Sequence, residues 1–117
     1  MLALLLFLAA TPPTGVWRGD STCTVAASAC TNEKVVYYID PVPKRSDLLQ
    51  IRADKIVDGK AVTMGTSEFQ YDAEKGTLTW ETAGRVWRLV VDGNRIDGTL
   101  TVPPSTLFRR VRLQKQE

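Results

Sequence analysis

The sequence predicts an all-β protein, built as a single small up-and-down antiparallel β-barrel of eight or nine strands. Runs rich in β-branched and aromatic residues follow the first ten residues, and turn signals separate them at intervals of roughly 8–12 residues. No helical pattern of useful length interrupts these runs. Short hairpins join neighbouring runs, which favours a barrel over a sandwich because sandwiches generally need longer crossing connections.

The first half of the chain contains three predicted strands. Gly15 to Thr24 forms the first strand, and Glu33 to Asp40 forms the second, which is the most β-prone segment of the chain. Pro41 to Asp47 should break the sheet, because proline cannot donate to a strand ladder. Leu48 to Val57 is the third strand, and the Asp58-Gly59 pair after it is typical of a two-residue type I′ hairpin.

The second half of the chain is predicted to complete the sheet. Lys60 to Ser67 and Glu68 to Tyr71 form one strand or two, because Gly65 indicates a bend or a bulge. A loop that ends at Gly76 and a second hairpin signal at Asp92-Gly93 separate the later runs. The remaining predicted strands are Thr77 to Thr82, Val86 to Val91, Asn94 to Val102 and Thr106 to Lys115.

Length and composition exclude several classes of protein. A chain of 117 residues forms one hydrophobic core, and a formal charge of +2 gives no overall field that would recruit nucleic acid or an acidic membrane. The chain has no histidine, so the commonest general base is missing, and it has no nucleophile turn, phosphate-binding loop or metal-ligand spacing. We expect a protein that is not an enzyme and that uses no metal or cofactor.

The start of the chain predicts an export signal. Met1 to Ala10 is apolar throughout, too short for a membrane helix of about 20 residues but within the roughly 7–15 residues of a signal-peptide core. The alternative is a first core strand. We expect residues 1–10 to be a signal peptide and residues 11–117 to form a single barrel domain. The mature chain would then be periplasmic or secreted, without stable membrane insertion.

The chain has two cysteines, Cys23 and Cys30, separated by six mostly small residues. In an exported protein an even cysteine count predicts a disulfide, which would fix the loop between the first two strands. The alternative is a redox pair or half of a metal site. It has less support, because redox cysteines are usually two residues apart and no histidine exists to complete a zinc site.

Gly15, Trp17 and Arg109 together resemble the signature of lipocalins and their calycin relatives. In that family a Gly-x-Trp on the first strand is covered by an arginine from the last strand. The resemblance implies that these three residues close one end of the barrel, with the guanidinium over the indole in a cation–π contact. The chain also looks like small exported barrel proteins of bacteria, through the motifs Cys23-x6-Cys30-Thr31-Asn32-Glu33 and Asp97-Gly98-Thr99-Leu100.

The barrel interior is the first candidate site. An eight-stranded barrel is just wide enough for its own side chains to fill it, or to hold one small ligand. The expected wall of such a cavity is aromatic: Tyr38 or its neighbour Tyr37, with Phe69, Tyr71, Trp80 and Trp87. The alternative is a solid core that these side chains fill completely.

Arginines late in the chain form a second candidate site. Arg88, Arg110 and Arg112 fall on the outward face of neighbouring predicted strands, where they could bind an anionic partner or another protein. The alternative is a solvated surface whose charge is balanced by nearby carboxylates, and the near-neutral chain gives the patch no independent support.

These observations predict a non-catalytic exported binding protein. The first hypothesis is a carrier or sensor that holds a small apolar molecule inside the barrel. The second is a protein-binding module of the cell envelope, such as an inhibitor of a secreted hydrolase. The second follows from resemblance, because several bacterial inhibitors are small disulfide-bonded barrels that open with Gly-x-Trp. A cavity favours the carrier, and a filled core with a protruding segment from Thr11 to Thr14 favours the inhibitor.

Overall fold

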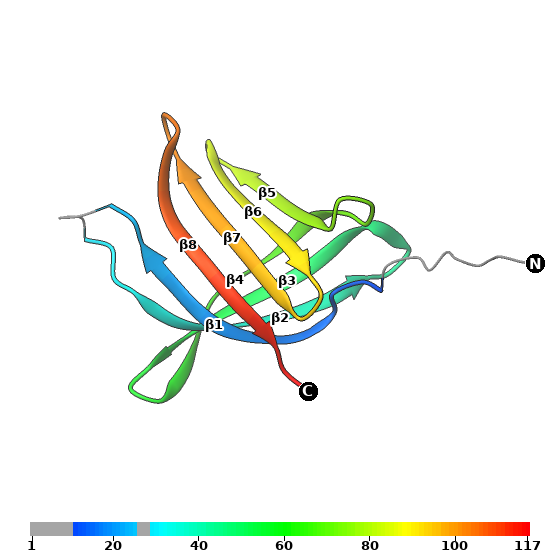
Figure 1. Cartoon of the computed structure of the whole chain (residues 1–117), viewed down its shortest axis with the longest axis horizontal. Helices are drawn as coiled ribbons and strands as arrows, with labels where there is room; N and C mark the ends of the chain where they lie inside the picture. The colour runs from blue at the N-terminus through cyan, green and yellow to red at the C-terminus, as the bar shows by residue number, and fades with distance from the viewer. Residues whose placement is uncertain (1–10, 26–28) are drawn as a thin grey trace, which may run out of the picture.

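The computed structural model describes residues 11–25 and 29–117, whose regular structure is entirely β-strand (Figure 1). Each strand pairs antiparallel with the next, and the last pairs with the first, so the sheet closes into an eight-stranded up-and-down barrel. The predicted fold class is confirmed. The strands are β1 (Gly15–Cys23), β2 (Glu33–Val42), β3 (Arg45–Val57), β4 (Lys60–Asp72), β5 (Thr77–Thr82), β6 (Arg85–Asp92), β7 (Arg95–Val102) and β8 (Thr106–Lys115). The expected signal segment, residues 1–10, lies outside the described residues.

The hairpin between β3 and β4 has the predicted turn. Val57 pairs with Lys60, and the two residues between them, Asp58 and Gly59, have φ angles of 51° and 79°. A type I′ turn requires a positive φ at both central positions, which an Asp-Gly pair accepts at little steric cost. This hairpin projects beyond the rest of the barrel at the lower left of Figure 1.

The stretch from Lys60 to Asp72 is one strand, so the barrel has eight strands rather than nine. Thr63 pairs with Asp54 and Gly65 pairs with Ala53, which leaves Met64 as an extra residue in β4. This irregularity is a β-bulge, and it lies one residue from the glycine that predicted it.

The proline-containing segment after β2 was expected to form a loop, and this expectation is wrong. β2 continues to Val42, which pairs with Arg45 at the start of β3, so only Pro43 and Lys44 form the turn. The ladder shifts register between Pro41 and Val42. Proline is tolerated at such an irregularity because the bulge interrupts the regular pattern of ladder hydrogen bonds.

The closed end of the barrel is organised around Trp17. Its indole is 1% exposed, and Nε1 donates a 3.0 Å hydrogen bond to the carbonyl oxygen of Pro13. Every strand contributes to the buried core: β2 contributes three residues, β3 and β8 contribute two each, and the other strands contribute one each. The core cluster consists of Trp17, Val35, Tyr37, Ile39, Leu49, Ile51, Phe69, Leu78, Leu89, Ile96, Val111 and Leu113.

The pairing between β4 and β5 is much shorter than the two strands allow. Only Gln70–Asp72 of β4 pair with Thr77–Thr79 of β5. Beyond these pairs the strands diverge: β5 runs up toward the β5–β6 turn in Figure 1, and the earlier part of β4 lies on the side of the β3–β4 hairpin. The barrel is therefore split along one side at its open end.

Candidate functional site

The open end of the barrel contains a cavity of about 350 Å³. It lies at the end opposite Trp17, where β1 ends, β2 and β8 begin, and the β5–β6 turn is placed. Alternation along each strand turns every second side chain inward, so the wall combines aliphatic and aromatic groups with a few polar ones. The lining residues are Ser21, Glu33, Val35, Tyr37, Ile51, Ala53, Met64, Gly65, Ser67, Phe69, Trp80, Arg85, Trp87, Leu100, Phe108 and Arg109.

Three of the five predicted aromatic wall residues line this cavity. Phe69 and Trp80 lie on the two edges of the split, with ring centroids 5.8 Å apart and ring planes inclined by 42°. Trp80 also pairs with Trp87 across the β5–β6 ladder. Aromatic groups in this arrangement provide a large apolar surface that a flat or branched hydrocarbon can contact.

The other two predicted wall residues lie elsewhere. Tyr38 points outward from β2, where the guanidinium carbon of Arg52 lies 4.1 Å from its ring centroid. Tyr71 lies near the β4–β5 turn, beside surface depressions that Ala73 also lines and away from the cavity. The expectation for both residues is wrong: Tyr38 has the outward parity of its strand, and Tyr71 is too far along β4.

Tyr37, the alternative to Tyr38 in the sequence analysis, lines the cavity. Its side chain is 4% exposed, and it lies in the cavity wall near Arg109 and Glu33. Burial raises the pKa of the Tyr37 hydroxyl far above its ordinary value, and the nearby Arg109 lowers it by less. The phenol is therefore neutral at physiological pH and keeps a hydroxyl group at the wall, because an apolar environment disfavours the charged form.

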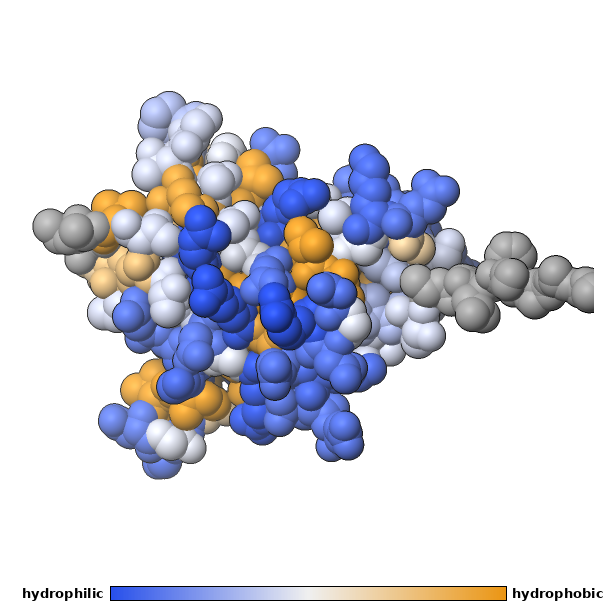
Figure 2. All heavy atoms as spheres, viewed as in Figure 1, coloured by the Kyte–Doolittle hydropathy of each residue, from blue (hydrophilic) through white to orange (hydrophobic). Residues whose placement is uncertain are grey.

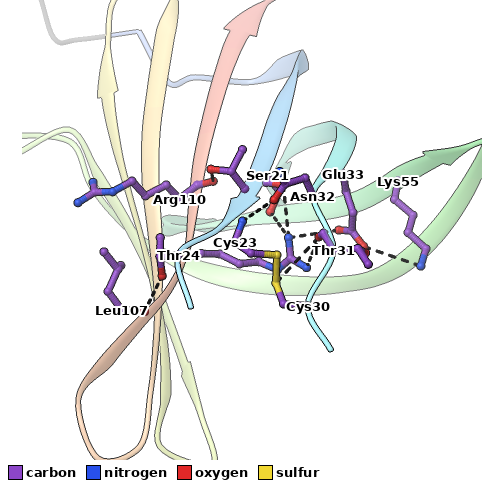
Figure 3. Close-up of a disulfide and its surroundings, with 12 residues drawn as sticks. Ser21, Cys23, Thr24, Cys30, Thr31, Asn32, Glu33, Lys55, Leu107 and Arg110 are labelled. Atoms are coloured by element: carbon purple, nitrogen blue, oxygen red, sulfur yellow. Dashed lines mark hydrogen bonds and ion pairs between the residues drawn. A yellow bond between two sulfur atoms is a disulfide. The ribbon is translucent and has the colours of Figure 1, made fainter. Parts of the chain in front are cut away.

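Arg109 forms a polar cluster at the rim of the cavity. Its Nη1 donates to Ser21 Oγ at 2.9 Å, its Nη2 donates to the carbonyl oxygen of Thr31 at 2.9 Å, and Glu33 Oε1 lies 3.7 Å from Nη1. The side chains of Arg109 and Glu33 are only 13% and 16% exposed. Figure 3 shows Ser21, Thr31 and Glu33 gathered beside the disulfide. The cluster ties β1, β2 and β8 together at the open end.

The predicted contact between Arg109 and Trp17 is absent, and the register of the β1–β8 ladder explains why. Arg109 pairs with Cys23, whereas the residue that pairs with Trp17 is Lys115. Trp17 and Cys23 are six positions apart on β1, roughly 20 Å of extended strand. Lys115 also lies beside Gly15, where a Cβ would be 3.3 Å from its Cε. Gly15 and Trp17 thus lie at the closed end, and Arg109 lies at the open end.

Cys23 and Cys30 form the predicted disulfide, with a Cα–Cα distance of 6.1 Å. The segment on either side of the bond is held by further contacts. Asn32 Oδ1 accepts a 2.8 Å hydrogen bond from the Cys23 amide, and the Thr24 amide donates to the carbonyl oxygen of Phe108 at 3.0 Å. The bond therefore fixes the connection between β1 and β2 beside the cavity rim (Figure 3).

The predicted arginine patch is only partly assembled. Arg110 and Arg112 line one depression on the outer face of β1, β7 and β8, but Arg88 lines a different one. Arg112 pairs with Asp97 on β7 and with Asp20 on β1, so acidic residues flank it on both sides. The depression on β1, β7 and β8 is lined by four arginines, Arg18, Arg95, Arg110 and Arg112, and by two aspartates, Asp20 and Asp97, so its charge is mixed and positive on balance.

The described part of the chain has no group of three or more acidic or cysteine side chains placed to hold a metal ion. Among the same residues no helix is long and apolar enough to cross a membrane.

The fold and the cavity define a class of protein: a small disulfide-bonded β-barrel that is closed by a tryptophan at one end and hollow at the other. This architecture is compatible with a lipocalin-like fold. Comparison with family models, curated proteins and solved structures finds no match to this chain.

Proposed function

We propose that this protein is a non-catalytic exported carrier or sensor that holds a small apolar molecule in the open end of its barrel. The observation that carries the proposal is the cavity of about 350 Å³ and its aromatic wall. Small-molecule sites are concave and mainly apolar, with volumes of roughly 300–1,000 Å³. A volume near the lower end of that range favours a compact ligand, such as a mono- or bicyclic hydrocarbon skeleton, over a long lipid chain.

A few polar groups at one side of the cavity support a preferred orientation of the ligand. The neutral Tyr37 hydroxyl lies in the wall, and Arg85 lies at the exposed rim. Arg109 and Glu33 form an ion pair, so an apolar ligand would not have to desolvate an unpaired charge. A ligand with one hydroxyl or carbonyl group would direct it toward Tyr37 and place its hydrocarbon part against Phe69 and the two tryptophans.

The proposed location is the periplasm or the extracellular space. A structural disulfide is consistent with an oxidising compartment, because cytosolic thiols are normally kept reduced. The apolar leader supports the same location, since its length matches a signal-peptide core.

The N-terminal segment favours the carrier over the hydrolase inhibitor. An inhibitor of the kind considered from the sequence would project Thr11 to Thr14 toward its target. Instead, Pro13 is buried and accepts the Trp17 hydrogen bond, and the Thr14 amide donates to the carbonyl oxygen of Pro12 at 2.8 Å. Pro13 therefore anchors the segment at the closed end of the barrel, where the exposed Thr11 and Pro12 line a depression beside Trp17.

Titration with the neutral fluorescent probe N-phenyl-1-naphthylamine tests the proposal. We expect saturable one-to-one binding, and we expect Ala53→Phe to weaken it by about tenfold or more, equivalent to about 1.4 kcal/mol, because the new ring occupies the cavity. Ser67→Leu narrows the cavity from the neighbouring strand and gives a second, less disruptive variant.

The matched control is Thr66→Phe, which adds the same ring at an exposed position of β4 that the cavity does not include. It should leave the affinity for the probe unchanged. Equal binding by wild type and both filling variants would contradict a site inside the barrel, as would an absence of saturable binding.

A further inference from the structure

The split between β4 and β5 leaves two strand edges open toward each other. Gly65–Phe69 of β4 pair with β3 on one side, and Trp80–Thr82 of β5 pair with β6 on one side. Across the split the two segments do not pair, because the β4–β5 ladder ends at Gln70 and Thr79. Among the described residues these facing edges interrupt an otherwise closed sheet. The N–H and C=O groups on the unpaired side of each edge point into the split, where they form a template for another strand.

The side chains at the split disfavour further pairing of the two strands. Continuing the β4–β5 register by two residues would place Glu68 directly opposite Glu81. Like charges at directly opposite positions destabilise an antiparallel pair. The bulge at Met64 adds to the effect, because a bulge bends its strand and increases the local twist. Two carboxylates and one inserted residue thus disfavour pairing across the split.

The split has a different chemical character on its two sides. On the inner side, Ser67, Phe69 and Trp80 face the apolar cavity. On the outer side lies a depression of about 340 Å³ in which both charged residues, Glu68 and Glu81, are acidic. The side chains of a strand point alternately to the two faces of its sheet. A strand placed in the split would therefore direct one set of side chains to an apolar wall and the other set to two carboxylates.

We propose that the split binds an extended segment of a partner protein in which apolar and basic residues alternate. Backbone hydrogen bonds to the β4 and β5 edges would supply affinity, and the alternation would supply specificity, as in other cases of strand addition to a sheet. The segment would complete the wall of the barrel with Lys or Arg between Glu68 and Glu81. The inference is independent of the proposed carrier function, although an inserted apolar side chain would reach the same cavity.

Charge argues for a partner segment over a second copy of this chain. The part of β4 from Ala61 to Gln70 contains no basic residue, so the β4 edge of a second copy offers no positive charge to Glu68 and Glu81. The exposed apolar side chains of the β3–β4 hairpin, Val57, Val62 and Met64, lie close to the split in sequence and extend the apolar surface available to the partner. Figure 2 shows this apolar surface on the projecting hairpin.

The test uses an acetylated and amidated heptapeptide of alternating valine and lysine, with a peptide of alternating valine and glutamate as its charge control. We expect the lysine peptide to bind at least tenfold more tightly by isothermal titration calorimetry. Amide hydrogen exchange followed by NMR should show new protection in Gly65–Phe69 and Trp80–Thr82. The double variant Glu68→Gln and Glu81→Gln should weaken binding of the lysine peptide by about tenfold, because a desolvated charge pair is lost.

Glu74→Gln provides the matched control, because it removes one exposed negative charge from the β4–β5 loop, outside the split. It should leave peptide affinity unchanged. The inference is overturned if both peptides bind alike, if protection appears on other strands, or if the double glutamine variant binds as well as wild type. Self-association through β4 in sedimentation velocity, without peptide binding, would also overturn it. The probe titration tests the cavity and the peptide titration tests the split, so a negative result in one experiment leaves the other proposal standing.

Discussion

Gly19→Ala is expected to destabilise the barrel by about 3 kcal/mol or more, the upper range for overpacking in a well-packed structure. Gly19 lies on β1 and pairs with Leu113 across the seam that closes the barrel. A Cβ at this position would lie 1.8 Å from the carbonyl oxygen of Arg112 and 2.9 Å from the Cα of Leu113. Both atoms belong to the backbone, so β1 and β8 must separate for the methyl group to fit.

Urea unfolding followed by tryptophan fluorescence measures this effect. The matched control is Gly65→Ala on β4, where a Cβ meets no atom within 4 Å and the backbone φ is not positive. We expect the control to change the free energy of unfolding by less than about 0.5 kcal/mol, as is usual for surface positions. If the two variants have equal stability, β1 and β8 are not packed as closely at Gly19 as the structure has them.

Trp17→Ala should cost about 3–5 kcal/mol, the usual range for removing a large buried aromatic side chain. The indole is 1% exposed and closes the end of the barrel opposite the cavity. Its Nε1 hydrogen bond also holds the carbonyl oxygen of Pro13, so the substitution releases the N-terminal segment from the barrel. Thermal unfolding by circular dichroism measures the loss.

Trp17→Phe separates the two contributions of this residue. It keeps most of the apolar contact but removes the donor, so we expect a smaller loss than for alanine, with about 1 kcal/mol from the missing hydrogen bond. Because Trp17 does not line the cavity, neither variant should alter probe binding while the protein stays folded. A loss of binding that is larger than the loss of stability would contradict the placement of Trp17 at the closed end.

Local patterns in the sequence predict the strands well, because strand alternation and tight turns depend on residues that are only a few positions apart. Alternation with period two gives the strands, and the Asp58-Gly59 pair gives a turn through its backbone conformation alone. The bulge near Gly65 is detectable for the same reason. The end of β2 was predicted wrongly because the free-energy cost of a proline in a strand depends on the neighbouring ladder. Pro41 lies next to a register shift, which only the folded sheet reveals.

The candidate site was harder to predict because it depends on parity and register between distant strands. Tyr37 and Tyr38 are consecutive tyrosines, so alternation cannot decide which one faces inward; the pairing of β2 with both neighbours decides it. Arg109 and Lys115 are both basic residues of β8, and only the β1–β8 register shows which one lies near Trp17. The Arg109–Glu33 cluster and the split between β4 and β5 arise from the same long-range pairing.

The location of a bound apolar molecule is the central question, and isotope-filtered NOE spectroscopy of the complex with N-phenyl-1-naphthylamine answers it most directly. Trp80 and Trp87 line the cavity, whereas Trp17 lies at the other end of the barrel. We predict NOEs from the probe to the ring protons of Trp80 and Trp87 and none to Trp17. NOEs to the exposed Val57 and Val62 of the projecting hairpin, which lie outside the cavity, without contacts to the cavity tryptophans, would contradict the carrier function.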